Sequence, residues 1–207
     1  ESLENGSAFD ALSITSPEAV SVTQSGTAST GNFEVNVTNL ASAQSLYSGA
    51  FVATTTEIGT GTLTIAIGAP NYVAGSSGNY SGFTQSSTKD IAIDSTNNTV
   101  AGIRDAINAA DAGVTAAILM DGSNVRLVVT SDDTGASNAI SISVADGDGD
   151  NSNTSGLSQL AYHYDSVSLS HVGNLTESQI ARDSTFTLNG ISLTNESNAI
   201  SGLIDGL

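Results

Sequence analysis

The sequence predicts a mainly β fold with a few short α-helices, an α+β chain built from small antiparallel units. Three observations predict it. Most apolar runs alternate with small or polar residues, as half-buried strands do. Two turn pairs, Asp121-Gly122 and Asn189-Gly190, each join such runs and favour a hairpin. The stretch 98–110 instead repeats its apolar residues with helical spacing.

The first fifty residues predict strands of mixed clarity. Phe9–Ile14 is an apolar lead-in, and Ser16-Pro17 interrupts it, because the residue before proline is biased away from helix. Ala19–Thr23 and Phe33–Thr38 then predict a hairpin with a small, polar connection. Leu40–Phe51 permits either a short helix or a continued strand, and the pattern does not separate the two.

A clear strand follows at Leu63–Ile67, bounded by glycines. Pro70–Ser87 then reads as a long polar loop carrying Tyr72, Tyr80 and Phe83. Loops of this length in a compact domain are uncommon and often functional. The three aromatic residues are therefore candidate contacts for a partner, and the alternative is that they anchor the loop to its own domain.

The central stretch predicts a strand, a helix and a hairpin in succession. Lys89–Ile93 alternates as a strand does, and Asn98 and Thr99 offer oxygens that can cap a helix beginning at Val100. We expect Gly113 to end this helix, since glycine enters the left-handed conformation without a Cβ penalty. The apolar runs Val114–Met120 and Val125–Thr130, joined across Asp121-Gly122-Ser123-Asn124, predict the hairpin.

An acidic run follows the next predicted strand, Ala139–Val144. Asp146, Asp148 and Asp150 have the alternate spacing of a calcium loop. An EF-hand loop would also need Gly at its sixth position and Glu at its twelfth, and here those positions hold Asn151 and Leu157. A solvated acidic loop is the alternative, and it is the one we expect.

The last fifty residues predict a helix, a hairpin and a second helix. Thr176 and Gln179 fit a capping box ahead of a short helix with Ile180 and Ala181. Asn189-Gly190 joins Phe186–Leu188 to Ile191–Leu193, the strongest hairpin signal in the chain. A final short helix is expected, capped by Asn198. Its apolar residues are Ile200, Leu203 and Ile204.

Charge and composition argue against several classes of function. The 207 residues carry 21 acidic side chains, four basic ones and a formal charge of −17. Binding to nucleic acid or to an anionic membrane surface is not expected, because both need a basic surface. The sequence contains no cysteine, no serine-hydrolase elbow and no nucleotide-binding glycine motif, so we expect neither an enzyme nor a cofactor. No signal-peptide pattern is present at the start, and the chain reads as a fragment of a longer protein.

Several short segments resemble known flagellar proteins. The first group is similar to the repeat shared by flagellins and hook-associated proteins. The second group resembles the head region of the flagellar filament cap family. The first group is Ile103–Asn108, Gly113–Ala116, Arg126-Leu127, Thr130-Ser131 and Thr134-Gly135; the second is Gly156–Ser158, Tyr164-Asp165, Leu175-Thr176, Ala181–Asp183, Phe186–Ile191 and Ser197–Ile200.

This resemblance implies a two-domain head. Residues 1–52 plus 165–207 would form the inner head domain, and 53–164 the outer one, inserted into the first. It implies a structural factor that promotes flagellin polymerisation at the growing filament tip. Flagellin and identical subunits in a ring would be its partners, while this fragment alone is expected to be monomeric. The expected location is outside the cell, at the flagellum tip, after export without a cleavable signal peptide.

Two other functions stay open at this stage. The outward-facing loops could serve as an adhesive module that binds a host surface or a glycan. A variable domain of flagellin or of another hook-associated protein would share the repeat. The Asn189-Gly190 hairpin followed by Ser197–Ile200 favours the cap family over that last alternative.

Overall fold

The computed structural model describes residues 21–23, 31–75 and 79–203. Its described part is mainly β, with three antiparallel sheets and one α-helix, which confirms the predicted fold class. The elements are β1 (Val35–Asn39), β2 (Ser45–Tyr47), β3 (Gly61–Tyr72), β4 (Tyr80–Ile93), α1 (Val100–Ala109), β5 (Val114–Asp121), β6 (Asn124–Ser131), β7 (Ala139–Asp146), β8 (Tyr162–Asp165), β9 (Ser170–Gly173), β10 (Thr176–Gln179), β11 (Ser184–Leu188) and β12 (Ile191–Asn195), with 3₁₀ turns at Ala136–Asn138 and Gly156–Leu160.

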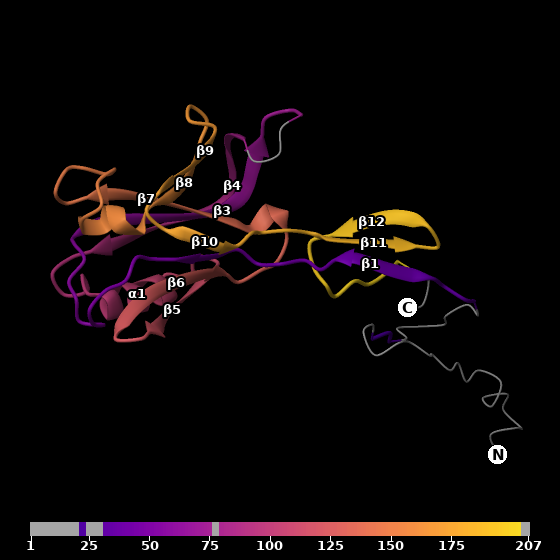
Figure 1. Cartoon of the computed structure of the whole chain (residues 1–207), viewed down its shortest axis with the longest axis horizontal. Helices are drawn as coiled ribbons and strands as arrows, with labels where there is room; N and C mark the ends of the chain where they lie inside the picture. The colour runs from indigo at the N-terminus through magenta and orange to yellow at the C-terminus, as the bar shows by residue number, and fades with distance from the viewer. Residues whose placement is uncertain (1–20, 24–30, 76–78, 204–207) are drawn as a thin grey trace, which may run out of the picture.

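The molecule is elongated, and its three sheets lie in two groups along its length (Figure 1). The five-stranded sheet has the order β4-β3-β7-β8-β9, and the four-stranded sheet has the order β10-β2-β6-β5. Both lie toward one end of the molecule, and the three-stranded sheet β1-β11-β12 lies toward the other. No helix in the described ranges is long and apolar enough to cross a membrane.

The predicted loop over 70–87 is wrong, because β3 and β4 form one long ribbon there. Their pairing runs from Gly61 opposite Ile93 to Tyr72 opposite Tyr80, with bulges near Ile67 and Asn71. Most β4 side chains before Ile91 are exposed on both faces of the ribbon. Apolar alternation is therefore absent, although the backbone of β3 still supplies the ladder hydrogen bonds.

The four-stranded sheet resolves one open alternative and corrects one prediction. Within Leu40–Phe51 the structure has β2, a strand that pairs with β6. Thr176–Gln179 is β10, which pairs with β2, so the predicted capping box and helix are wrong. A short helix gains little by itself, and the hydrogen bonds and packing of the sheet outweigh its local signal.

The α-helix begins as predicted but ends earlier. Thr99 accepts a hydrogen bond from the backbone N–H of Gly102 at 3.1 Å, and Val100 is fully buried. The helix ends at Ala109, and Asp111, not Gly113, takes the first left-handed conformation after it, with φ of 50°. Gly113 has φ of 74° and leads the chain into β5.

The three-stranded sheet confirms the Asn189-Gly190 hairpin. Both turn residues have positive φ, 48° and 79°, and Leu188 lies opposite Ile191. The partner of β1 is β11, rather than the predicted strand Ala19–Thr23. Of that strand, 21–23 have no strand structure, and 19 and 20 lie outside the described residues, as does Phe9–Ile14.

The final helix predicted from Asn198 is not formed up to Leu203, and Ile204 lies outside the described residues. The Asn198 side chain instead accepts a hydrogen bond from the Ala41 N–H at 2.7 Å and donates one to the Ala41 carbonyl at 2.9 Å. These tertiary bonds use the oxygen that a helix cap would need.

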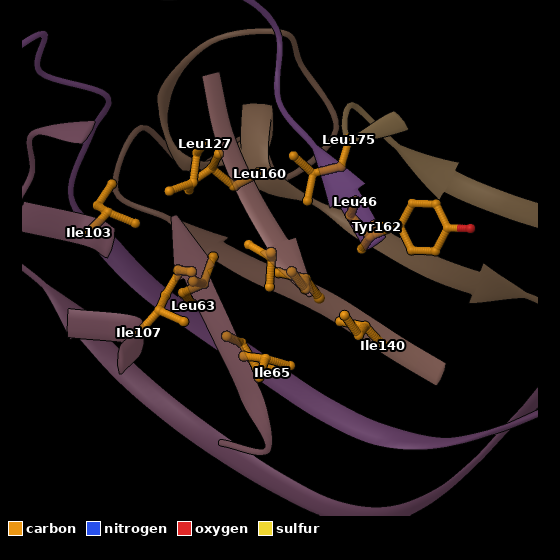
Figure 2. Close-up of a cluster of buried hydrophobic side chains, with 14 of the residues drawn as sticks. Leu46, Leu63, Ile65, Ile103, Ile107, Leu127, Ile140, Leu160, Tyr162 and Leu175 are labelled. Atoms are coloured by element: carbon orange, nitrogen blue, oxygen red, sulfur yellow. The ribbon is translucent and has the colours of Figure 1, made fainter. Parts of the chain in front are cut away.

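One hydrophobic core lies between the two larger sheets and α1 (Figure 2). The core contains side chains from both larger sheets and from α1, so each sheet buries its apolar face against the other elements. Gly61–Gly68 of β3 supplies its central strand, which is paired on both sides by β4 and β7. The labelled core residues are Leu46, Leu63, Ile65, Ile103, Ile107, Leu127, Ile140, Leu160, Tyr162 and Leu175.

Candidate interaction surface

Two hairpins project together from one side of the five-stranded sheet (Figure 1). They are the far ends of β3 and β4 and the hairpin β8–β9, and the Tyr80 N–H donates to the Leu169 carbonyl at 3.0 Å. Tyr72 is 56% exposed and Val167 is 89% exposed. We call the exposed apolar residues here the paired tip: Tyr72, Val167, Leu169 and Val172.

The three aromatic residues predicted as partner contacts have different environments. Tyr80 and Phe83 are partly buried and pack on Tyr164, with ring centroids 4.8 and 5.1 Å away. Tyr72 contacts Tyr80 at 5.3 Å and leaves more than half of its surface exposed. Tyr80 and Phe83 therefore anchor the ribbon to its own domain. Contact with a partner stays a prediction, and Tyr72 is the one of the three residues exposed enough to make it.

The sequence did not single out the other members of the paired tip. The stretch Ser166–Val172 alternates serine with Val167, Leu169 and His171, which is the pattern of a strand. That pattern alone does not show that the stretch turns back to pair with β8. The left-handed conformation of Leu169, with φ of 55°, lies in the turn of that hairpin.

Gln44 lies beneath the aromatic residues and connects both larger sheets. Its side chain donates to the Tyr164 hydroxyl at 3.1 Å and to a carboxylate oxygen of Glu177 at 2.5 Å. The side-chain amide oxygen of Gln44, Oε1, accepts a hydrogen bond from the backbone N–H of Ile140 at 2.5 Å. Gln44 is 1% exposed, so these hydrogen bonds replace its lost contact with water.

Two buried tyrosines stay neutral in the folded chain. Burial is the main cause that raises the pKa of Tyr162 and of Tyr164 far above the usual value of 10.0. The negative charge of Glu177 raises both pKa values further. These hydroxyls therefore do not act as bases at neutral pH, and the rings serve as packing surface.

Alkaline pH is expected to destabilise the fold through these two residues. The unfolded chain loses its tyrosine protons near pH 10, while folded Tyr162 and Tyr164 keep theirs. The free energy of unfolding should be unaffected by them below about pH 9 and should fall as pH rises above about 10. Absorbance of tyrosinate, followed together with circular dichroism, should show the last two tyrosines ionising only as the chain unfolds.

Tyr162→Phe is expected to raise the free energy of unfolding by about 1 kcal/mol. Among the described residues the buried Tyr162 hydroxyl makes no hydrogen bond of good geometry and has only the Tyr164 hydroxyl close by, and a buried hydroxyl without a well-formed bond costs stability. Tyr164→Phe is the matched control, since it removes a hydroxyl that Gln44 does bond, and it should lower stability. Urea unfolding measures the free energy of unfolding of both variants. A loss of stability in Tyr162→Phe as large as that in Tyr164→Phe would contradict the prediction.

The acidic run forms a turn held by its own backbone. Asp148 and Asp150 each accept a backbone N–H two residues on, at 2.9 Å, and hydrogen bonds from Ser152 lower the pKa of Asp150. Asp146 is half-buried and accepts the Ser158 N–H at 2.8 Å, so it is not fully solvated as expected. In the described ranges no three acidic or histidine residues are grouped to hold a metal ion.

The three-stranded sheet has one apolar and one polar face. Opposite residues on the apolar face are Val35 with Leu188 and Phe186 with Leu193. A groove of about 450 Å³ lies beside them. It is lined by Phe33, Leu188, Asn189, Ile191, Leu193 and Leu203.

Three curated relatives match the chain, and no family model does. The B-type flagellar hook-associated protein 2 of Pseudomonas aeruginosa is 34% identical over 197 residues, which cover 90% of this chain and 36% of the relative. Flagellar hook-associated protein 2 of Escherichia coli K12 is 34% identical over 203 residues, covering 96% of this chain and 38% of the relative. The chain thus spans a little more than a third of their length.

Solved structures match over the same region. The D2-D3 domains of the flagellar cap protein FliD from Escherichia coli give a TM-score of 0.69 at 33% identity, covering 91% of this chain and 86% of theirs. FliD (HAP2) from Pseudomonas aeruginosa PAO1 gives 0.63 at 33% identity, covering 89% and 74%. A longer D1-D2-D3 structure from Escherichia coli gives 0.71 at 32% identity, covering 92% and 48%.

The antiparallel sheets and these matches define the class: the chain belongs to the hook-associated proteins of the flagellum. Within that class it belongs to the flagellar hook-associated protein 2 family, the flagellar cap proteins named FliD. The predicted recognition of the filament cap family is confirmed.

Proposed function

We propose that this chain is the head part of a filament cap and that, within its full-length protein, it promotes flagellin polymerisation at the growing tip. The match to the solved D2-D3 domains, over 86% of their length, is the observation that carries this proposal. The role is structural rather than enzymatic, since the Gln44 amide and the Tyr164 hydroxyl below the paired tip are engaged in hydrogen bonds that hold the two larger sheets together.

The partners and the location follow from the same proposal. Flagellin would be the assembly partner, and identical subunits would form a ring in the full-length protein, outside the cell at the filament tip. Export without a cleavable signal peptide belongs to this proposal as well. We expect the isolated chain to be monomeric, because a formal charge of −17 opposes self-association.

The division into 1–52 plus 165–207 and 53–164 stays a prediction, and we propose moving its boundaries. Strands β2 and β10 come from the predicted inner domain, yet they pair in one sheet with β6 from the outer one. Ser42 and Arg182 exchange backbone hydrogen bonds of 2.8 and 3.0 Å where the chain enters and leaves the larger sheets. Residues 43–181 would then form the outer domain.

A deletion in the full-length protein tests the assembly role. Residues 43–181 would be replaced by a short Gly-Ser linker, which Ser42 and Arg182 can accept because they are already neighbours. Filament length in a strain without its own cap protein is the measurement, and we expect filaments to be lost or severely shortened. Normal filaments from a well-expressed deletion protein would overturn the proposal.

The same strain can distinguish an assembly role from the adhesive alternative, which the matches to known proteins do not support. Tyr72→Ser with Val167→Ser changes the paired tip without touching the core, because both residues are largely exposed. Normal filaments that no longer attach to host cells or glycans would favour an adhesin. Filaments that attach normally would remove that alternative for this surface.

A further inference from the structure

Ile107 and Asn108 lie in the segment that carries the resemblance to flagellins and hook-associated proteins, and they face different ways. Successive helical residues are about 100° apart, so neighbours cannot share one face. Ile107 is 1% exposed and packs in the core, whereas Asn108 is exposed in the last turn of α1. Core packing explains Ile107 but leaves Asn108 without a role.

The side chain of Asn108 binds both backbone groups of one residue in β5. Its Oδ1 accepts the Ala116 N–H at 2.7 Å, and its Nδ2 donates to the Ala116 carbonyl at 2.9 Å. A residue on a paired antiparallel strand makes the same two bonds with the residue opposite it. The amide of Asn108 therefore substitutes for a neighbouring strand at this point.

Strand β5 needs such a substitute because it is one of the two edge strands of the four-stranded sheet, the other being β10. An outer strand presents unpaired backbone groups and can pair with another chain. Natural edges are often guarded by charged side chains. Val114–Met120 contains no charged residue, and Leu119 and Met120 are 57% and 68% exposed.

Asp121, the charged residue at the end of β5, does not oppose pairing of this edge either. Asp121 forms an ion pair with Arg126 on the adjacent strand β6, at 2.6 Å. The hairpin end thus combines exposed apolar side chains with a locally neutral charge, which suits pairing between two β5 strands.

We propose that Asn108 closes the β5 edge and so prevents two copies of this chain from pairing edge to edge. The closure acts at Ala116, near the middle of the strand, so a second β5 cannot align along its full length. This role is separate from the proposed assembly function, because it concerns a contact that the folded chain avoids.

The test compares Asn108→Ala with Arg104→Ala, a change at another surface position of α1. Hydrogen exchange of the Ala116 amide and mass by light scattering are measured on the 207-residue chain. Salt of about 0.5 M shortens the range of the repulsion between highly charged chains to a few ångströms. Asn108→Ala should exchange at Ala116 at least about 10-fold faster and should move from 20.7 kDa toward twice that mass.

A double variant shows whether the β5 edge is the contact. Leu119→Lys added to Asn108→Ala should restore the monomer, because a lysine on an edge strand opposes pairing. Unchanged exchange at Ala116 would overturn the hydrogen-bonding role of Asn108. A monomeric Asn108→Ala, or a dimer that persists with Leu119→Lys, would overturn edge closure.

Discussion

Gln44→Ala is expected to lower the free energy of unfolding by about 4 kcal/mol, the largest loss that we predict for a single polar side chain here. Three groups lose their partner at once: the Ile140 N–H, the Tyr164 hydroxyl and the Glu177 carboxylate. Ile140 and Tyr164 are buried, and a buried group left unpaired costs about 1 to 3 kcal/mol, whereas Glu177 is half-buried and can turn to water. Urea unfolding followed by circular dichroism measures the loss.

Gln85→Ala is the matched control for Gln44→Ala. Gln85 lies on the exposed stretch of β4, so its removal should change stability by less than about 0.5 kcal/mol. Because Gln44 bonds to residues of β7, β8 and β10, its loss should also lower the cooperativity between the two larger sheets. A Gln44→Ala variant as stable as Gln85→Ala would show that water replaces these hydrogen bonds without cost.

Gly61→Ala is expected to destabilise the chain by about 3 kcal/mol. Gly61 begins the central strand β3 with φ of 141°, a conformation that other residues rarely adopt. A Cβ at this position would overlap the carbonyl oxygen of Ala145 on the paired strand β7. Backbone strain costs about 1 to 3 kcal/mol, and overpacking adds about as much again.

Gly49→Ala provides the control for Gly61→Ala. Nothing lies within 4 Å of a Cβ built at Gly49, which is exposed, so the change should be close to neutral. Thermal unfolding of the two variants separates a general effect of replacing glycine from the local overlap. Equal melting temperatures would mean that β3 and β7 move apart at little cost.

Local signals predicted the elements that a few neighbouring residues determine. The helix from Val100 was predicted because its apolar spacing and its Thr99 cap lie within twelve residues. The hairpin at Asn189-Gly190 was predicted because both residues tolerate positive φ. The resemblance that identified the family rests on short segments of the same kind.

Predictions failed where distant residues decide the outcome. Thr176–Gln179 forms a strand because β2 lies beside it, although its own residues fit a helix cap. The ribbon from Pro70 to Gln85 has no apolar alternation to reveal it, since it is exposed and held by its ladder. The paired tip could not be predicted for the same reason, as Tyr72 and Val167 are ninety-five positions apart in the chain.

The sequence by itself determined the β-rich class, the helix from Val100, the tight turns and membership of the cap protein family, because each is carried by local patterns or short segments of the chain. Only the tertiary structure decided that Gln44 connects two sheets, that Asn108 binds the β5 edge and that Ser42 meets Arg182. Each of these contacts depends on a single side chain or backbone group, whether the partners are eight residues apart, as Asn108 and Ala116 are, or 96 apart, as Gln44 and Ile140 are, so it leaves no periodic pattern in either segment. They form only when the shared core brings the two backbones together.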